Sequence, residues 1–367
     1  MPTQLYLSLQ DEDRIGRFAL DEANGRLSAI GAIQVADGPG PLALHPTGSA
    51  LYVGHRGPGA RRGGRVDGLP RPEFALSSFA IDRRTGELMP GGRRVPVGGE
   101  PCFLATDRRG RYLLSAYYQA GHCAVHPIDA KGALGGAAIE WRDTNSGAHS
   151  FQMEASNRFA FVPHIAQSPP LARLPAGRQT AANAIFQFRF DPETGQLTPN
   201  DPPRVSPEGP LGPRHFVFHP TLPLLYVDNE QGSSVTVYAL DRERGTLQPG
   251  QTISTLPDGF AGTNHPSEIA LHPSGRWLYV ANRGHNSIAI FHADDAGALI
   301  SAGWEEAPAG PRTLALDPGG RFLYSSGLER GELRSYRIDP ASGALDAIES
   351  LSVGALPMWI TIVALDG

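Results

Sequence analysis

One hydrophobic pattern recurs along the whole chain. An alternating apolar run leads into a short turn, often His-Pro-x-Gly or Asp-Pro-x-Gly, and a second run rich in aromatic and aliphatic residues follows. A period of two is typical of half-buried strands, and such turns favour an antiparallel hairpin. The pattern occurs at residues 42–54, 103–115, 151–163, 216–228, 269–281 and 314–326.

A second pattern follows each of these hairpins. It is an alternating strand that reaches an aspartate and then a turn containing Gly and Leu. The turn glycines supply the positive φ that tight hairpins need, and they are 46 to 63 residues apart. This is the period of a four-stranded propeller blade with variable loops. The glycines are Gly86, Gly132, Gly195, Gly245, Gly297 and Gly343.

The two ends of the chain supply a seventh repeat. QLYLSLQ and IGRFALDEANGRL at the N-terminus read as strands two to four of a blade, and PMWITIVAL at the C-terminus reads as strand one. Pairing the ends hides the edge strands. We therefore predict an all-β fold, with residues 1–367 forming a single seven-bladed β-propeller domain of four antiparallel strands per blade. A β-sandwich is the alternative, but sandwiches do not repeat one hairpin pattern at a near-constant period.

Composition narrows the function classes. The net charge of −5 and pI of about 6.2 give no general attraction to nucleic acid or to an anionic membrane. No apolar stretch approaches the roughly 18 residues of a membrane span, and the N-terminus lacks a basic segment followed by an apolar run, so we expect a cytoplasmic protein. Cys102 and Cys123 have neither disulfide-framework nor zinc-site spacing. The sequence leaves the oligomeric state open.

Aligning the blades predicts which residues meet at one end of the ring. The start of strand one and the end of strand two lie at the same end of an antiparallel blade. Residues there differ from blade to blade, whereas the opposite end repeats HPTG, HPSG and DPGG turns, in which His45, His219 and His272 look structural. Irregularity in a regular repeat indicates a site built by the whole ring. The candidates are Arg56, Tyr118, His149, Arg214, His215, Glu230, Glu268, Arg283 and Arg312.

Two insertions at this end, 57–72 and 166–183, carry many arginines against one acid, Asp67. Arginine binds carboxylate and phosphate through a two-pronged fork, so we predict a basic rim and a small anionic partner. The alternative is that the insertions are solvated loops without a function. The arginines are Arg61, Arg62, Arg65, Arg71, Arg173 and Arg178.

A resemblance to a known family covers nearly the whole chain. It is strongest in the segments SGAHSFQM, GPRHFVFHP, LLYVDNEQGSSVTVY, SEIALHPSGRWLYVANRGHNSI and LPMWI. The chain resembles the propeller lactonases, which include the bacterial cycloisomerase-type 6-phosphogluconolactonase and the fungal 3-carboxy-cis,cis-muconate lactonising enzyme. The family's proposed active-site histidine, two arginines and glutamate match His149, Arg214, Arg283 and Glu230. The insertions depart from the compact bacterial members.

The resemblance implies hydrolysis of a sugar-acid lactone, 6-phosphogluconolactone or a related anionic lactone, without a metal or other cofactor. His149 would be the general base or acid, and Glu230 would orient it or exchange protons with it. Arg214 and Arg283 would hold the anion and stabilise oxyanion charge. The second group of candidates for substrate binding is Arg56, Tyr118, His215, Glu268 and Arg312.

Several alternatives stay open. Glu230 and Arg283 could form a structural ion pair between blades, and His215 and Glu268 could satisfy only backbone groups. The same site could instead form or open a lactone by addition to a double bond, as in a cycloisomerase. A propeller can also be a non-catalytic binding platform, although a polar, arginine-rich rim is unlike the apolar surface expected of one.

Overall fold

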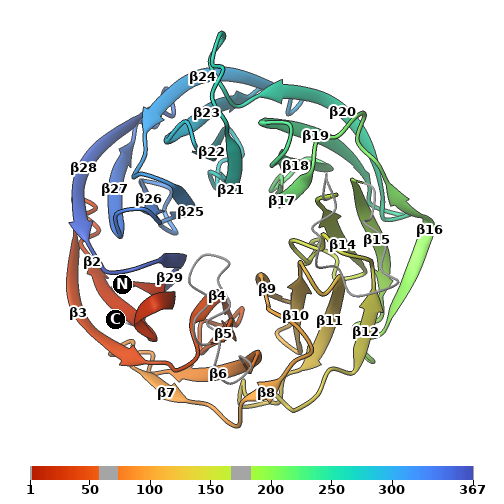
Figure 1. Ribbon diagram of the computed structural model, residues 1–367, viewed down its shortest axis with the longest axis vertical. Coiled ribbons are helices and arrows are strands. Elements are labelled where there is room, and N and C mark those ends of the chain that lie inside the picture. The colour runs from red at the N-terminus through yellow and green to blue at the C-terminus, as the bar shows by residue number, and fades with distance from the viewer. Residues whose placement is uncertain (1, 58–72, 167–182, 367) are drawn as a thin grey trace, which may run out of the picture.

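The computed structural model describes residues 2–57, 73–166 and 183–366. Seven antiparallel sheets stand around a common axis, each with its first strand innermost and its last strand on the outside (Figure 1). The predicted seven-bladed propeller is therefore confirmed. The predicted basic rim on the two insertions lies almost wholly outside the described residues.

From the axis outwards, the closing blade consists of β29 (Pro357–Ala364), β1 (Thr3–Leu9), β2 (Arg14–Leu20) and β3 (Leu27–Gln34), with a short 3-10 helix η1 (Gln10–Glu12) between β1 and β2. The next blades, in the same order, are β4 (Pro39–Leu44), β5 (Ala50–His55), β6 (Ala75–Ile81) and β7 (Leu88–Pro90), with β8 (Val95–Pro96) also on β6; then β9 (Phe103–Thr106), β10 (Tyr112–Tyr117), β11 (His122–Pro127) and β12 (Glu140–Asp143). The last four are β13 (Gln152–Met153), β14 (Phe159–His164), β15 (Ala184–Phe190) and β16 (Leu197–Val205); β17 (Pro213–Phe218), β18 (Leu224–Asn229), β19 (Ser234–Asp241) and β20 (Thr246–Ser254); β21 (His265–Leu271), β22 (Trp277–Arg283), β23 (Ser287–Ala293) and β24 (Leu299–Glu306); and β25 (Pro311–Leu316), β26 (Phe322–Gly327), β27 (Glu332–Ile338) and β28 (Leu345–Ser352).

The ring closes through the two ends of the chain. β29 pairs antiparallel with β1 along its whole length, from Thr3 opposite Ala364 to Leu9 opposite Pro357. The two ends lie side by side in the closing blade (Figure 1). This pairing satisfies the backbone of both terminal strands and confirms the closure predicted from PMWITIVAL.

The apolar face of each strand packs between neighbouring blades. One buried cluster, for example, joins Tyr226 and Val237 of one blade to Ile269, Val280 and Phe291 of the next. Because a blade buries both faces in this way, its inner strands carry apolar residues on both sides, and separate apolar clusters lie between successive blades.

A tyrosine in the second strand of several blades joins it to the following blade. The Tyr279 hydroxyl donates to the Gly343 carbonyl at 2.9 Å, and the Tyr52 hydroxyl donates to the Gly132 carbonyl at 3.0 Å. Gly343 has φ of +70°, and a Cβ there would lie 2.3 Å from the Trp277 ring. The turn glycines that set the period of the sequence therefore also let the blades approach closely.

The HP turns form the opposite end of the ring and bind the next blade. Nε2 of His45 is 3.1 Å from the Gly110 carbonyl oxygen, and Nε2 of His272 is 2.8 Å from the Gly320 carbonyl oxygen. Nδ1 of His219 accepts the backbone N–H of Leu222 at 2.9 Å. These histidines are bound within turns and between blades, as the repeat predicts.

Candidate functional site

The backbone register brings the predicted variable positions to one end of the ring. Just beyond the paired ends of strands one and two, Glu230 N–H donates to the Gly212 carbonyl at 2.8 Å. The equivalent bond in another blade runs from Arg56 N–H to the Gly38 carbonyl at 3.0 Å. Glu230 and Arg56 therefore occupy equivalent positions in their two blades. The candidate residues come from six of the seven blades and lie at the same end of the ring.

Glu230 links two arginines from adjacent blades. Its Oε2 accepts from Nε of Arg214 at 2.8 Å, and its Oε1 accepts from Nη2 of Arg283 at 3.2 Å. Burial alone would raise the pKa of Glu230, but the charges of Arg214, Arg283 and Arg312 outweigh it and hold the pKa below its ordinary value. Glu230 is therefore ionised at neutral pH and fixes Arg283 at the edge of the site.

Arg214 lies beneath this carboxylate and is completely buried. Its Nη1 donates to the Ser267 carbonyl of the next blade. The sequence predicts Arg214 as an anion ligand, but a guanidinium without exposed surface does not reach a substrate. Arg214 therefore holds Glu230 and joins the β17 and β21 strands, whereas Arg283 and Arg312 are partly exposed.

A second set of contacts runs through three successive blades. Nδ1 of His149, which precedes β13, is 3.2 Å from Nε2 of His215 on β17. Nδ1 of His215 is in turn 3.0 Å from Oε1 of Glu268 on β21. The resemblance implies that Glu230 orients His149 or exchanges protons with it, but both Glu230 oxygens are bound to arginines. The residue that contacts His149 is His215, which the sequence places only among the secondary substrate ligands.

Aromatic rings close the axis beside these histidines. The Phe103 ring of β9 packs edge-on against His215, with 5.2 Å between centroids, and against Trp359 of β29 at 5.5 Å. These three residues come from blades that are not neighbours in the ring, so their side chains fill the centre at this level. Tyr118 packs edge-on against the His149 ring at 5.5 Å. The site therefore has an apolar floor and wall, which reduce the local dielectric constant.

Arg312 on β25 adds a further positive charge to the site and is held by no direct ion pair in the described part of the chain. Arg56 forms an ion pair with Glu100, and Arg214 and Arg283 share Glu230. Within residues 2–57, 73–166 and 183–366, the Arg312 guanidinium has neither a hydrogen-bond nor an ion-pair partner. Burial, followed by the charges of neighbouring arginines, lowers the pKa of Arg312 well below its ordinary value. The ordinary pKa of arginine is so high that the side chain is charged at neutral pH.

Burial, together with the surrounding charges, sets the ionisation of the groups inside the site. Burial, followed by the charge of Arg214, lowers the pKa of His149 and of His215 well below the ordinary value. Both imidazoles are therefore neutral at pH 7. Burial raises the pKa of Glu268 to about 7, although Arg214 and Arg312 act against it. The neutral His149 is the group best able to accept a proton here.

Sequence reasoning missed a further carboxylate of the site, the fully buried Asp228. Oδ1 of Asp228 accepts the backbone N–H of His215 at 2.6 Å, and burial raises the pKa of Asp228 to about 7. Asp228 belongs to the phrase YVDN, which resembles a structural strand ending. Phe103 and Trp359 were also missed, although both share the aligned position of His215.

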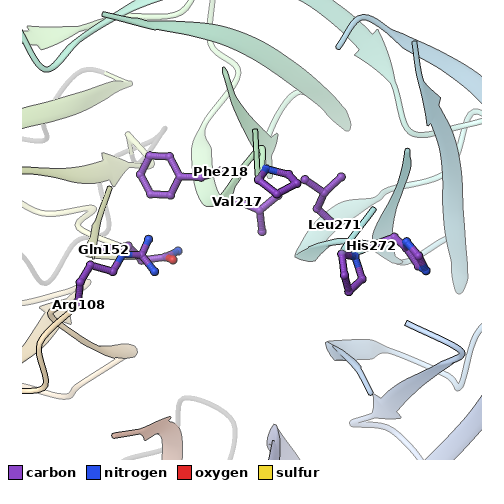
Figure 2. A pocket seen from close by; sticks show the side chains of 8 residues that line it. Arg108, Gln152, Val217, Phe218, Leu271 and His272 are labelled. Atoms are coloured by element: carbon purple, nitrogen blue, oxygen red, sulfur yellow. The ribbon is translucent and has the colours of Figure 1, made fainter. Parts of the chain in front are cut away.

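The opposite end of the ring has a different character. A cavity of about 290 Å³ there is lined by residues of β17, β21 and the HP turns, together with Arg108 and Gln152 (Figure 2). Arg108 donates to the Met153 and Glu154 carbonyls, and His272 belongs to a turn. We interpret this cavity as a structural gap between blades.

In the part of the chain that the structure describes, no group of three or more His, Cys, Asp or Glu side chains is placed to hold a metal ion, and no helix is long and apolar enough to cross a membrane.

Comparisons with known proteins agree with this architecture. A family model described as "Lactonase, 7-bladed beta-propeller" matches residues 4–362. A 6-phosphogluconolactonase of Pectobacterium carotovorum is 31% identical over 367 residues, covering 100% of both chains. A 6-phosphogluconolactonase of Yersinia pestis is 31% identical over 363 residues, covering 99% of this chain and 98% of the relative. The solved structure of the periplasmic gluconolactonase of Pseudomonas aeruginosa superposes with a TM-score of 0.87 at 25% identity, covering 100% of both chains.

Proposed function

The chain belongs to the seven-bladed β-propeller lactonase family and is a lactone hydrolase, and we propose that its substrate is an anionic sugar-acid lactone such as 6-phosphogluconolactone. The observation that carries this proposal is Arg312 beside Arg283, because the Arg312 guanidinium has no direct ion-pair partner among the described residues. A partly buried cation without a counter-ion is costly, and a substrate carboxylate or phosphate relieves that cost. Relatives named 6-phosphogluconolactonase support the phosphate, whereas the structural neighbour named gluconolactonase indicates a related sugar lactone.

His149 performs the proton transfers in the proposed reaction. Its neutral imidazole takes a proton from water while the water oxygen attacks the lactone carbonyl carbon, and a tetrahedral intermediate forms. The bond from this carbon to the ring oxygen then breaks, and the imidazolium gives its proton to that oxygen. One water is consumed, the ring opens to a hydroxy acid, and His149 returns to its neutral form.

The arginines stabilise the negative charge that develops. Arg283 is held by Glu230 and is about a quarter exposed, with 28% of its side chain accessible. Arg312 forms no direct ion pair among the described residues, although Glu230 and Glu268 lie near enough to feel its charge. We assign Arg312 to the anionic substituent of the substrate and Arg283 to the oxyanion, because donors fixed before the reaction need no reorganisation during it. The apolar floor of Phe103 and Trp359 strengthens both interactions.

A substrate panel tests the proposal. Purified protein is given 6-phosphogluconolactone, the uncharged glucono-δ-lactone and 3-carboxy-cis,cis-muconate, and product formation is followed against spontaneous hydrolysis. We expect kcat/KM for the phosphorylated lactone to exceed that for the uncharged lactone by at least about tenfold, a difference of about 1.4 kcal/mol. Preference for the uncharged lactone would contradict the anionic substrate. Turnover of the muconate alone would show a cycloisomerase instead.

We also propose that the protein acts in the cytoplasm, as the phosphorylated substrate class favours. The neighbour of known structure is a periplasmic protein by its name. Fractionation of cells that express the full natural gene decides between the two compartments. Recovery of the activity in the periplasmic fraction would overturn this part of the proposal.

A further inference from the structure

Three ionisable side chains from successive blades form a continuous row at the site. His149 Nδ1 is 3.2 Å from His215 Nε2, and His215 Nδ1 is 3.0 Å from Glu268 Oε1. The His215 side chain is only 2% exposed and that of Glu268 is 12% exposed. Nε2 of His149 has no hydrogen-bond partner among the residues that the structure describes. The row therefore begins at a buried carboxylate and ends at one ring nitrogen that no described residue contacts by a hydrogen bond.

The chemistry of the end group decides where the protons lie. An ionised carboxylate only accepts hydrogen bonds, so Nδ1 of His215 carries a proton and donates it to Glu268. In a neutral imidazole the other nitrogen is then an acceptor, and His215 Nε2 accepts from Nδ1–H of His149. The same rule leaves Nε2 of His149 without a proton. One carboxylate thus fixes the tautomers of two histidines.

We propose that Glu268 is a positioning residue: acting through His215, its carboxylate keeps the proton of neutral His149 on Nδ1 and leaves Nε2 as the base. The statement that Nε2 of His149 acts as a base in catalysis rests on the proposed lactone hydrolysis. The proton positions themselves are independent of any substrate.

His215 is placed to transmit this effect and not to bind substrate. Phe103 and Trp359 pack on its ring with centroids 5.2 and 6.0 Å away. Nη1 of Arg214 lies 3.2 and 3.3 Å from the two ring nitrogens, nearly equidistant, so it adds positive charge without favouring one nitrogen. The orientation of the His215 ring is fixed by the hydrogen bonds of its Nε2 with His149 and of its Nδ1 with Glu268.

Glu268 has a second task when His149 becomes protonated. Burial, followed by the charge of Arg214, opposes an imidazolium at this place and lowers the pKa of His149. A carboxylate at the far end of the row stabilises that imidazolium through the intervening ring, as the aspartate of a hydrolase triad does. Without it, His149 would be too weak a base in this arginine-rich site.

Protonation of Glu268 reverses the row. Glu268 would then donate to His215 Nδ1, His215 Nε2–H would donate to His149 Nδ1, and Nε2 of His149 would carry the proton. Burial raises the pKa of Glu268 to about 7. The charged and titratable groups around Glu268 are Arg214 and His215 from β17, Asp228 from β18 and Arg312 from β25.

The decisive measurement is nitrogen NMR of His149 in the substrate-free full-length protein. The ¹⁵N shifts separate a protonated ring nitrogen from an unprotonated one, and His149→Gln assigns the signals. At pH 8.5 we expect Nδ1 protonated and Nε2 unprotonated, with the proton moving to Nε2 as the pH falls through about 7. A proton on Nε2 at pH 8.5 would overturn the inference, whatever the protein hydrolyses.

Glu268→Gln tests the carboxylate without changing its shape. Glutamine can present either its oxygen or its NH₂ group to His215, so we expect mixed tautomers at His149 that no longer change near pH 7. For a lactone that the parent hydrolyses, kcat should fall about 10²-fold while KM changes less than about twofold. His215→Phe keeps the aromatic packing and should give the same two results.

Asp228→Asn is the matched control. Asp228 is a buried carboxylate beside the same arginine and also has a raised pKa, but it contacts the backbone N–H of His215 and not the ring. We expect the His149 tautomer to be unchanged and kcat to stay within about threefold. Equal effects of Asp228→Asn and Glu268→Gln on both readouts would show a general electrostatic effect and contradict the inference. An inactive parent protein with the expected tautomer would contradict the proposed function alone.

Discussion

Arg283 donates a hydrogen bond to Glu230 across the boundary between two blades, with 3.2 Å between Nη2 and Oε1. The second oxygen of this carboxylate neutralises the fully buried Arg214. Glu230 is therefore needed by one arginine inside the fold and by one at the edge of the site. Its substitution should affect stability as well as catalysis.

Glu230→Gln should lower the free energy of unfolding by about 2–4 kcal/mol, because it leaves buried arginine charge without a counter-ion. Urea denaturation measures this loss. Glu193→Gln is the control, since Glu193 also accepts from two arginines, Arg109 and Arg111, at 2.7 Å each, but it is 65% exposed. We expect the control to lose less than about 1 kcal/mol. Equal losses would show that the burial of Glu230 does not matter.

His149→Ala should lower kcat for lactone hydrolysis by about 10²- to 10⁴-fold, because it removes the neutral ring that we assign as the proton acceptor. The melting temperature, measured by circular dichroism, should show that the fold persists. His272→Ala, in an HP turn at the opposite end, should keep kcat within about twofold. Full activity of the His149 variant on every lactone that the parent hydrolyses would remove His149 from the mechanism.

Arg312→Gln should raise KM for an anionic lactone by about tenfold, equivalent to about 1.4 kcal/mol of binding, and leave KM for an uncharged lactone unchanged. Initial rates with both substrates measure this difference. Arg337→Gln removes the same charge from an exposed position on strand β27 and should change neither value. An equal rise for both lactones would mean that Arg312 shapes the site without binding the anion.

The free energy of unfolding should decrease as the pH is lowered from 6.5 to about 4. Five buried histidines have a lowered pKa in the folded protein, so the unfolded chain takes up protons in this range while the folded chain does not. Burial is the largest cause in each case. The histidines are His55, His126, His149, His164 and His215.

Asp228 and Glu268 act in the opposite direction, because their pKa is raised to about 7 and the folded protein holds protons that the unfolded chain releases. Five histidines against two carboxyl groups leave a net uptake of about three protons on unfolding near pH 5. The slope of unfolding free energy against pH, from urea titrations at closely spaced pH values, measures this number. A flat or negative slope between pH 4.5 and 6 would contradict the expectation.

Tyr279→Phe should lower stability by about 0.5–1.5 kcal/mol, because it removes the hydroxyl that donates to Gly343 of the next blade. Tyr238→Phe provides the comparison. Tyr238 is equally buried, but its hydroxyl has no hydrogen-bond partner in the described ranges, so its removal should be neutral or stabilising. Thermal unfolding of the two variants in parallel tests the difference, and a greater loss for Tyr238→Phe would contradict it.

Much of the fold could be predicted because its signals are local. The HP turns, the turn glycine at Gly343 and the alternation around Tyr279 each depend on a few neighbouring residues, and their repetition fixes the blade length. The pairing of the two chain ends followed from the count of strands, although its register did not. The shared end of His149, Arg214, Glu230 and Arg283 also followed, since antiparallel pairing fixes which strand ends coincide.

The partners within the site could not be predicted in the same way. His215 and Glu268 were predicted as substrate ligands, yet His215 is sealed beneath aromatic rings and Glu268 contacts it from the next blade. Arg214 was predicted at the substrate and is fully buried. An aligned position gives the level of a residue in its blade, but it does not give the direction or the exposure of its side chain.

The sequence by itself determined the strands, their order, the closure of the ring and the end at which the irregular residues gather, because period-two patterns and turn glycines act over short distances along the chain. Only the tertiary structure decided that Glu230 serves two arginines, that His149 depends on His215 and Glu268, and that Arg312 is left without a partner among the described residues. These relationships join separate blades. They depend on the twist of each sheet and on how closely seven blades approach one axis, and no stretch of neighbouring residues encodes either quantity.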